Sequence, residues 1–302
     1  DVNHFYGFKE EDTAIDKKDI KQIFNEIGGK VSVASYYKDS NLINYKASLG
    51  YAYFKDNFSA VENNIVFTGE ARKTVNSEIY GVDLMVDYNN YSRDENIPLG
   101  IIPHTLPNNV KTNNTILKLT PNVTKYGEKW YVKVGVDMHV DIQDKSSFFF
   151  FPNAEAKYSF FDIFVPYIGV NRDLQRNSFK SMTRQNPFLL SDVRLQNTNT
   201  KYNLYAGIRG SVSNKITFNL MAARKNIYGN NLFFTDSVYS IGNKMNVLYD
   251  TMDVTEINAQ IMYDQTDKLR VYINGKYSFF SPLNQEYVWN TPALDITIGG
   301  IY

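Results

Sequence analysis

The sequence lacks cysteine altogether and contains only two tryptophans in 302 residues. Without cysteine, a disulfide framework and a thiolate metal site are both excluded. Basic and acidic residues are equal in number, 32 of each, so the basic excess that nucleic-acid partners usually demand is also missing. No segment approaches the roughly 18 consecutive apolar residues that a membrane-spanning helix needs. We therefore predict no nucleic-acid partner and no membrane-spanning helix.

The first residues, DVNHFYGF, show neither the basic region nor the apolar region of a signal peptide. We expect that a signal peptide has been removed or that the chain begins inside a longer one. No linker, composition break or solenoid-length repeat interrupts the sequence. We predict a single domain over residues 1–302 and leave open whether it is incomplete at either end.

Aromatic residues are abundant, with 23 tyrosines and 20 phenylalanines. Both suit half-buried strands, and tyrosine also suits the boundary between lipid and water. The dominant pattern is an alternation of apolar and polar residues, which predicts β-strands. In residues 130–141, six apolar side chains from Trp130 to Val140 alternate with polar ones that include Lys133, Asp137 and His139. Residues 43–53, 80–88, 202–212 and 269–279 alternate in the same way.

Short polar turns and longer connections follow one another along the chain. Turns are predicted near residues 73–77, 125–128 and 213–215, and long loops near 173–200 and 226–252. Short turns at one end and long loops at the other are typical of outer-membrane barrels. We predict an all-β fold, an antiparallel transmembrane β-barrel of about 12–14 strands that is either whole or part of a larger barrel. A soluble β-sandwich would also alternate, but it has no reason to place aromatics at the ends of apolar faces.

Two stretches carry a resemblance to a known family: FVPYIGVNRDLQRNSFKSMTRQNPFL, at Phe164–Leu189, and KYNLYAGIRGSVSNKITFNL, at Lys201–Leu220. They resemble the barrel region of Bacteroidota outer-membrane proteins related to TonB-dependent receptors. The resemblance implies an outer-membrane barrel inserted by the barrel-assembly machinery. The sequence departs from full receptors, because no plug domain and no TonB-contacting box is recognisable in it. Uptake of a siderophore, vitamin or glycan is therefore not carried over.

Candidate catalytic chemistry is confined to His139, which shares the polar face of its strand with Asp137 and Asp141. A carboxylate two residues away can orient an imidazole. However, no Gly-x-Ser-x-Gly turn supplies a nucleophile. Paired histidines and an EF-hand loop are also missing from the sequence. We predict no catalytic, metal or cofactor-binding residues and no cofactor, and the chain is not expected to be an enzyme.

Two groups of charged side chains are candidate contact residues. The first is predicted to face the barrel lumen: Lys46, Asp83, Asp87, Lys118, Lys133, Asp137, His139, Glu155, Lys157, Arg209 and Lys276. These charges either tune the selectivity of a channel or pair across a closed interior. The second group belongs to the long loop at 173–200 and is predicted to contact lipopolysaccharide or a partner protein: Arg176, Lys180, Arg184 and Arg194.

Three functions stay open at this point. The first is a transport, channel or receptor-like barrel in the bacterial outer membrane, and the second is a structural or assembly subunit that anchors a multi-protein complex. The third is a lipid-modifying barrel enzyme. The predicted partners are outer-membrane lipid and lipopolysaccharide, the barrel-assembly machinery, and other outer-membrane or periplasmic subunits.

Overall fold

The computed structural model describes residues 2–3, 21–35, 42–93, 110–143, 145–161, 163–237, 244–266 and 269–302. Thirteen strands form one antiparallel sheet in which each strand pairs with its neighbours in sequence, from β3 to β15. The first six are β3 (Phe24–Ala34), β4 (Asn44–Asp56), β5 (Val61–Val75), β6 (Glu78–Arg93), β7 (Val110–Tyr126) and β8 (Trp130–Ile142). The others are β9 (Ser146–Tyr158), β10 (Phe164–Gln175), β11 (Thr198–Ser213), β12 (Ile216–Thr235), β13 (Met245–Thr266), β14 (Leu269–Pro282) and β15 (Leu294–Ile301).

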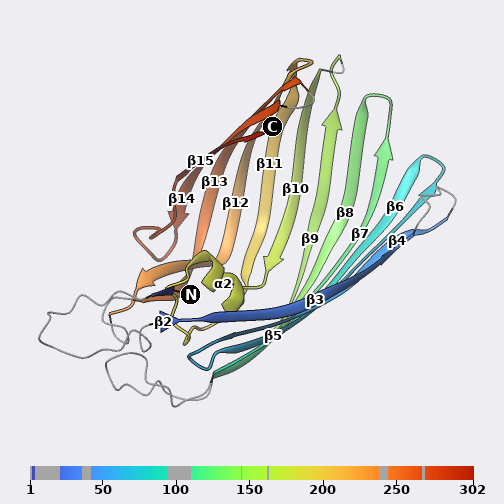
Figure 1. The fold of residues 1–302 in the computed structure, drawn as a ribbon. Helices are drawn as coiled ribbons and strands as arrows, with labels where there is room; N and C mark the ends of the chain where they lie inside the picture. The colour runs from blue at the N-terminus through green and yellow to red at the C-terminus, as the bar shows by residue number, and fades with distance from the viewer. Residues whose placement is uncertain are drawn as a thin grey trace, which may run out of the picture.

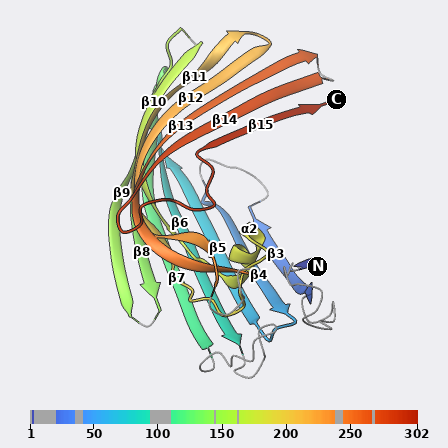
Figure 2. The same ribbon diagram turned by 90° about the vertical axis from the view of Figure 1, so that its left-hand side faces the viewer.

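The sheet curves into an arc with a concave and a convex face (Figure 1, Figure 2). In the described residues, β3 and β15 each pair on one side only, so the arc has two edges. The short helix α2 (Phe179–Gln185) lies inside the curve with the connection that carries it. A two-stranded sheet of β1 (Val2–Asn3) and β2 (Lys21–Gln22) lies near the same end of the molecule.

The strand register separates the side chains by polarity. Cross-strand partners on the convex face are apolar, as in Val136 with Pro152 and Ile273 with Ile298. Partners on the concave face are polar, as in Lys133 with Glu155. Shifting any strand by one residue would exchange the two faces, so the alternation fixes the register. The all-β antiparallel fold predicted from the alternation is confirmed.

The convex face leaves large apolar side chains open to the surroundings in a continuous band. Exposed residues include Leu49, Val134, Phe150 and Ile273, and Tyr80 and Tyr88 stand at the two ends of the apolar run of β6. A contiguous apolar surface of this extent marks contact with a membrane or a protein. No helix in the described parts of the chain is both long and apolar enough to cross a membrane.

Short turns lie at one end of the sheet, as the sequence predicts, but not every connection at the other end is long: those between β4 and β5 and between β8 and β9 span only residues 57–60 and 143–145. Short turns lie between β5 and β6, β7 and β8, and β11 and β12. The predicted loop at 226–252 is wrong in extent, because β12 continues to Thr235 and β13 begins at Met245. Gly229, with φ of +67°, lies in a register shift that bends β12 at this point. Beyond this bulge the hairpin continues and packs Phe233 into the interior.

Among the described residues, a buried cluster of nine side chains lies inside the curve rather than between two layers. It contains Phe54, Ala60, Tyr91, Phe179, Met182, Leu189, Val193, Leu195 and Phe233. Five of these nine come from the β10–β11 connection, and the others come from β4, β6, β12 and the β4–β5 turn. The core therefore forms where that connection folds onto the concave face.

Candidate functional site

The connection between β10 and β11, residues 176–197, is here called the inner segment. It contains helix α2, which begins after the N-cap Ser178 in a reciprocal capping box with Ser181. Ser178 accepts from the backbone N–H of Ser181 at 3.1 Å, and Ser181 Oγ accepts from the Ser178 N–H at 2.9 Å. The helix is short and needs its packing onto the sheet, since isolated helices of this length are marginal.

Apolar side chains hold α2 against β4 and β6. Phe179 is fully buried, and its ring centroid lies 5.9 Å from that of Phe54 and 5.4 Å from that of Tyr91. Tyr91 also donates its hydroxyl proton to the backbone carbonyl of Ser191. The inner segment is therefore fixed to the same strand through both its beginning and its middle.

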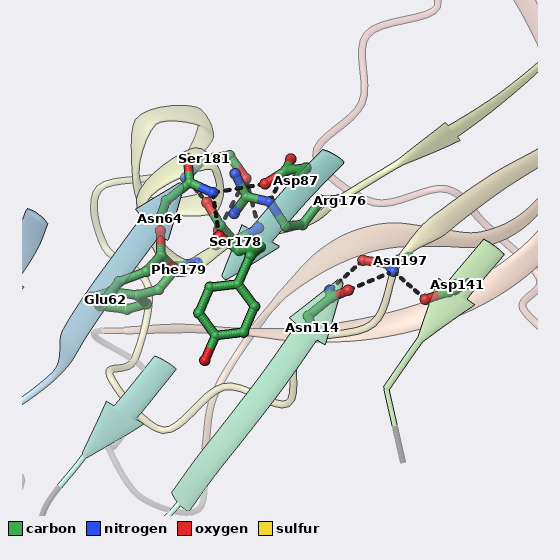
Figure 3. A network of polar contacts seen from close by, with 11 residues as sticks. Glu62, Asn64, Asp87, Asn114, Asp141, Arg176, Ser178, Phe179, Ser181 and Asn197 are labelled. Atoms are coloured by element: carbon green, nitrogen blue, oxygen red, sulfur yellow. Dashed lines mark hydrogen bonds and ion pairs between the residues drawn. The ribbon is translucent and has the colours of Figure 1, made fainter. Parts of the chain in front are cut away.

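Polar contacts surround the start of α2 (Figure 3). The Arg176 guanidinium donates to Asp87 Oδ2 at 2.9 Å, and Asn64 donates to the other carboxylate oxygen at 2.7 Å. Glu62 accepts from the backbone N–H of Phe179 at 2.6 Å. Each of these carboxylates belongs to the sheet and accepts a hydrogen bond from the inner segment. Hydrogen bonds to an ionised acceptor are stronger than those between neutral groups.

The middle of the inner segment reaches the opposite part of the arc. The backbone N–H of Leu190 donates to the carbonyl of Met245, and the Met245 N–H donates to the carbonyl of Phe188, both at 2.8 Å. Next to this pairing, Lys244 Nζ lies 4.1 Å from the ring centroid of Phe58. The inner segment and the start of β13 thus connect the β4–β5 side of the arc with the β12–β13 side.

The end of the inner segment is held by amides and one buried ion pair. Asn197 exchanges hydrogen bonds with Asn114 at 2.6 and 3.1 Å and donates to Asp141 at 2.7 Å (Figure 3). Asp192 lies 3.2 Å from the Arg93 guanidinium. Burial raises the pKa of Asp192, and the neighbouring Arg93 lowers it in part.

The residues that the sequence predicts to face a lumen all have concave-face positions in the strand register. Several form contacts across strands there: Lys118 with Asp173 at 2.6 Å, Arg72 with Asp83, and Asp137 with Asn153 at 3.0 Å. Glu155 and Lys157 pair at 2.7 Å on neighbouring positions of β9. The structure therefore places Asp83, Lys118, Glu155 and Lys157 in pairs of opposite charge along one polar wall.

His139 is the only histidine among the described residues and the one considered above for acid–base chemistry. It is 2% exposed, and its Nδ1 has no hydrogen-bond partner in the described structure. Asp137 accepts instead from Thr120 and Asn153 and does not orient the imidazole. His4 and His104 lie outside the described residues. No group of three or more metal-ligating side chains occurs in the described residues either.

The four basic residues predicted to contact partners differ in their environment. Arg176 is buried against Asp87, whereas Lys180 and Arg184 both reach Glu26, at 2.6 and 2.7 Å. Arg194 is exposed, and the described residues give it no ion pair. Three of the four therefore pair with carboxylates of the sheet, although the Arg184 side chain is 65% exposed.

Cavities adjoin the concave wall at several places, two of them at its opposite ends. One of about 470 Å³ lies between the end of the inner segment and β8–β9, lined by residues including Asp141, Gln143, Arg194 and Asn199. The other, of about 640 Å³, lies at the short-turn end beside Lys46, Glu70, Arg72 and Lys133. Both are polar, so the arrangement suits binding or passage of a hydrated solute.

Sequence reasoning missed the residues of the sheet that receive the inner segment. Glu62 and Tyr91, 1% and 0% exposed, were not predicted to have a role. A usable signal was present in the connection itself, where Phe179, Met182, Leu189 and Leu190 are too apolar for a solvated loop. Their partners on the sheet carried no such signal, because Glu62 and Asn64 look like ordinary polar positions of an alternating strand.

The amino-acid sequence matches no known protein family and no curated protein. The fold, in contrast, is similar to solved barrels of the TonB-dependent receptor type. The copper transporter OprC has a TM-score of 0.60 and 10% identity over 92% of this chain and 49% of its own. The siderophore receptor PirA from Pseudomonas aeruginosa has a TM-score of 0.58 and 11% identity over 86% of this chain and 49% of its own.

The FrpB iron transporter from Neisseria meningitidis gives a TM-score of 0.60 and 6% identity, over 90% of this chain and 47% of its own. The chain thus spans about half the length of the structures it matches. These neighbours are transporters and receptors rather than enzymes. At such low identity the likeness shows the fold alone, which is that of an outer-membrane β-barrel.

Proposed function

We propose that this chain forms the wall of a transport or receptor barrel in the bacterial outer membrane. The observation that carries the proposal is the division of the sheet into two faces. The convex face is apolar and exposed, whereas the concave face holds paired charges and a folded segment. A lipid-facing exterior and a polar interior are what an outer-membrane barrel requires. A kinship with Bacteroidota proteins stays a prediction from the sequence.

The two edges of the arc support the proposal that the wall continues. In the described residues, β3 and β15 each leave one row of backbone groups without a strand partner. Such edges are unstable in a membrane, where every backbone polar group must be satisfied. We propose that further strands pair with both edges and close the barrel, and that the barrel-assembly machinery inserts it.

The inner segment is proposed to control access to the interior. It is attached to β4, β5 and β6 on one side and to β13 on the other, so it crosses the concave face. A polar solute that enters from this end meets the cavity beside Arg194 and Asn199 before it reaches the charged wall. The end with the long connections is proposed to be extracellular and is where lipopolysaccharide contacts would lie.

Solute passage through the protein in its native membrane tests the proposal. We expect vesicles that carry the protein to admit small polar solutes faster when the inner segment is detached by Glu62→Ala and Arg176→Met together. A matched control is Arg270→Met, which removes an exposed ion pair at the other end of the sheet. Equal and negligible permeability in all three proteins, each shown to be inserted, would contradict transport and favour an anchoring role.

A further inference from the structure

The convex face has a hollow on its short-turn half. It has a volume of about 510 Å³ and extends from β5 across β6 and β7 to β8. Its lining is almost wholly apolar and includes Ala71, Tyr80, Val82, Pro121, Val123 and Val134. No residue of the inner segment contributes to it. Arg72, which pairs with Asp83 on the concave wall, also lines it, but the apolar lining lies on the convex face and is distinct from the site described above.

The cause of the hollow is a set of small side chains where neighbouring positions carry large ones. Ala71 pairs with Val82, which in turn pairs with Pro121 on β7. Pro121 has no backbone N–H to donate. The β7–β8 ladder is interrupted at this position, since its partners pass from Leu119 with Met138 to Asn122 with Gly135. Larger residues, such as Phe67 and Leu84, fill the same rows farther along the strands.

The end of the hollow that faces the short turns carries a polar rim. Lys73 is exposed and is the cross-strand partner of Tyr80. The Tyr80 hydroxyl donates to Glu78 at 2.8 Å, and Glu78 also pairs with Lys125 at 3.0 Å. Lys125 neutralises Glu78, so Lys73 is the remaining cation of this rim. Lysine and tyrosine at such a position lie at headgroup depth when the apolar surface is in a bilayer.

We propose that this hollow is a binding site for one anionic glycerophospholipid of the inner leaflet. An acyl chain lies in the groove over Ala71 and Pro121, and the phosphate contacts Lys73 beside the Tyr80 ring. The charge of Lys73 complements the phosphate, and the apolar lining matches the chain. The inference rests on the proposed membrane location but not on transport, because the hollow lies on the convex face.

Lipid retention tests the site directly. The protein is inserted into phosphatidylethanolamine vesicles with or without phosphatidylglycerol, extracted in mild detergent, and weighed by native mass spectrometry. We expect one retained phosphatidylglycerol in the parent protein. Ala71→Leu fills the groove and Lys73→Gln removes the cation, and each should reduce retention about tenfold. Ala206→Leu, on the same convex face, and Lys215→Gln, in another short turn, are the matched controls.

A second measurement uses the absence of cysteine, which makes a single Val82→Cys label unambiguous. We expect brominated phosphatidylglycerol to quench a fluorophore there more than brominated phosphatidylethanolamine does, and Ala71→Leu to remove the difference. Insertion with equal retention in all variants, or with no preference for the anionic lipid, overturns the lipid site alone. A protein that does not insert into vesicles overturns both this inference and the proposed function.

Discussion

The two halves of the concave face differ in what covers them. Over β4, β5 and β6 the inner segment packs Phe179 against Phe54 and Tyr91, and the carboxylates of Glu62 and Asp87 are buried. Over β14 and β15 the same face is open, and nearly every residue of β15 is exposed. The strands are regular in both halves, so we expect the sheet to form without the inner segment. The covering is a separate layer, and its contacts can be removed individually.

Loss of the central ring of this layer should have the largest effect. Phe179→Ala removes a fully buried side chain at the junction of β4 and β6. We expect the free energy of detaching the inner segment from the sheet to fall by about 3–5 kcal/mol, the usual loss for a buried phenylalanine. Hydrogen exchange should then be fast in residues 176–197 and unchanged in β8–β12. Phe188→Ala, at an exposed site of the same segment, is the control.

If the strands of the covered half unfolded together with the inner segment in Phe179→Ala, the two layers would be one cooperative unit. The inner segment would then not be a layer separate from the sheet.

We also expect attachment of the inner segment to depend on pH, because Lys244 lies where the inner segment meets the start of β13. Burial lowers the pKa of Lys244 from 10.5 to about 8. Between these values the unfolded chain binds more protons than the native one, so stability rises with pH across that window. The shift corresponds to about 3 kcal/mol. A fluorophore on Phe188→Cys should report a segment that becomes harder to detach in urea from pH 7 to pH 10.

Lys244→Met is the control for this pH dependence, because it removes the titrating group and keeps a long side chain. We expect the Lys244→Met protein to lack the rise. A slope that is unchanged in the variant would assign the pH dependence to another group.

The polar anchor should contribute less than the apolar one. Arg176→Met leaves Asp87 with its Asn64 contact but without its cation, and both members of the pair are mostly buried. We expect the free energy of detaching the inner segment to fall by about 2 kcal/mol, which is typical of a charged hydrogen bond. Arg270→Met breaks a more exposed pair with Asp264 and should cost less than about 1 kcal/mol. Equal losses in the two variants would show that burial does not distinguish the pairs.

The contrast between the halves also separates what the sequence predicts from what it does not. Alternation at 130–141 predicts β8, its apolar face and the concave position of Asp137, since strand geometry is local. The course of the inner segment depends on partners more than 80 residues away, as in Arg176 with Asp87 and Phe179 with Glu62. No local pattern links such residues. The sequence predicts the long connection, but the pairing of the mostly buried Arg176 with Asp87 cannot be predicted from it.

The smallest expected effect tests the wall itself, away from the covering. Gly207, on β11, lies opposite Tyr167, and a Cβ there would come within 2.5 Å of that ring and of the Leu220 carbonyl oxygen. A Cβ at Gly275, on β14, would have its nearest heavy atom, the carbonyl oxygen of Ala259, at 4.0 Å. We expect Gly207→Ala to lower stability by about 1–2 kcal/mol, as overpacking does, and Gly275→Ala to change it little. Unfolding in detergent, followed by tyrosine fluorescence, measures both.

Because Tyr167 also donates to Asn219 at 2.8 Å, a strong effect would show that the part of the concave wall outside the inner segment is rigid on its own. A neutral Gly207→Ala would instead mean that this lining yields, so that only the covered half of the interior has a fixed shape.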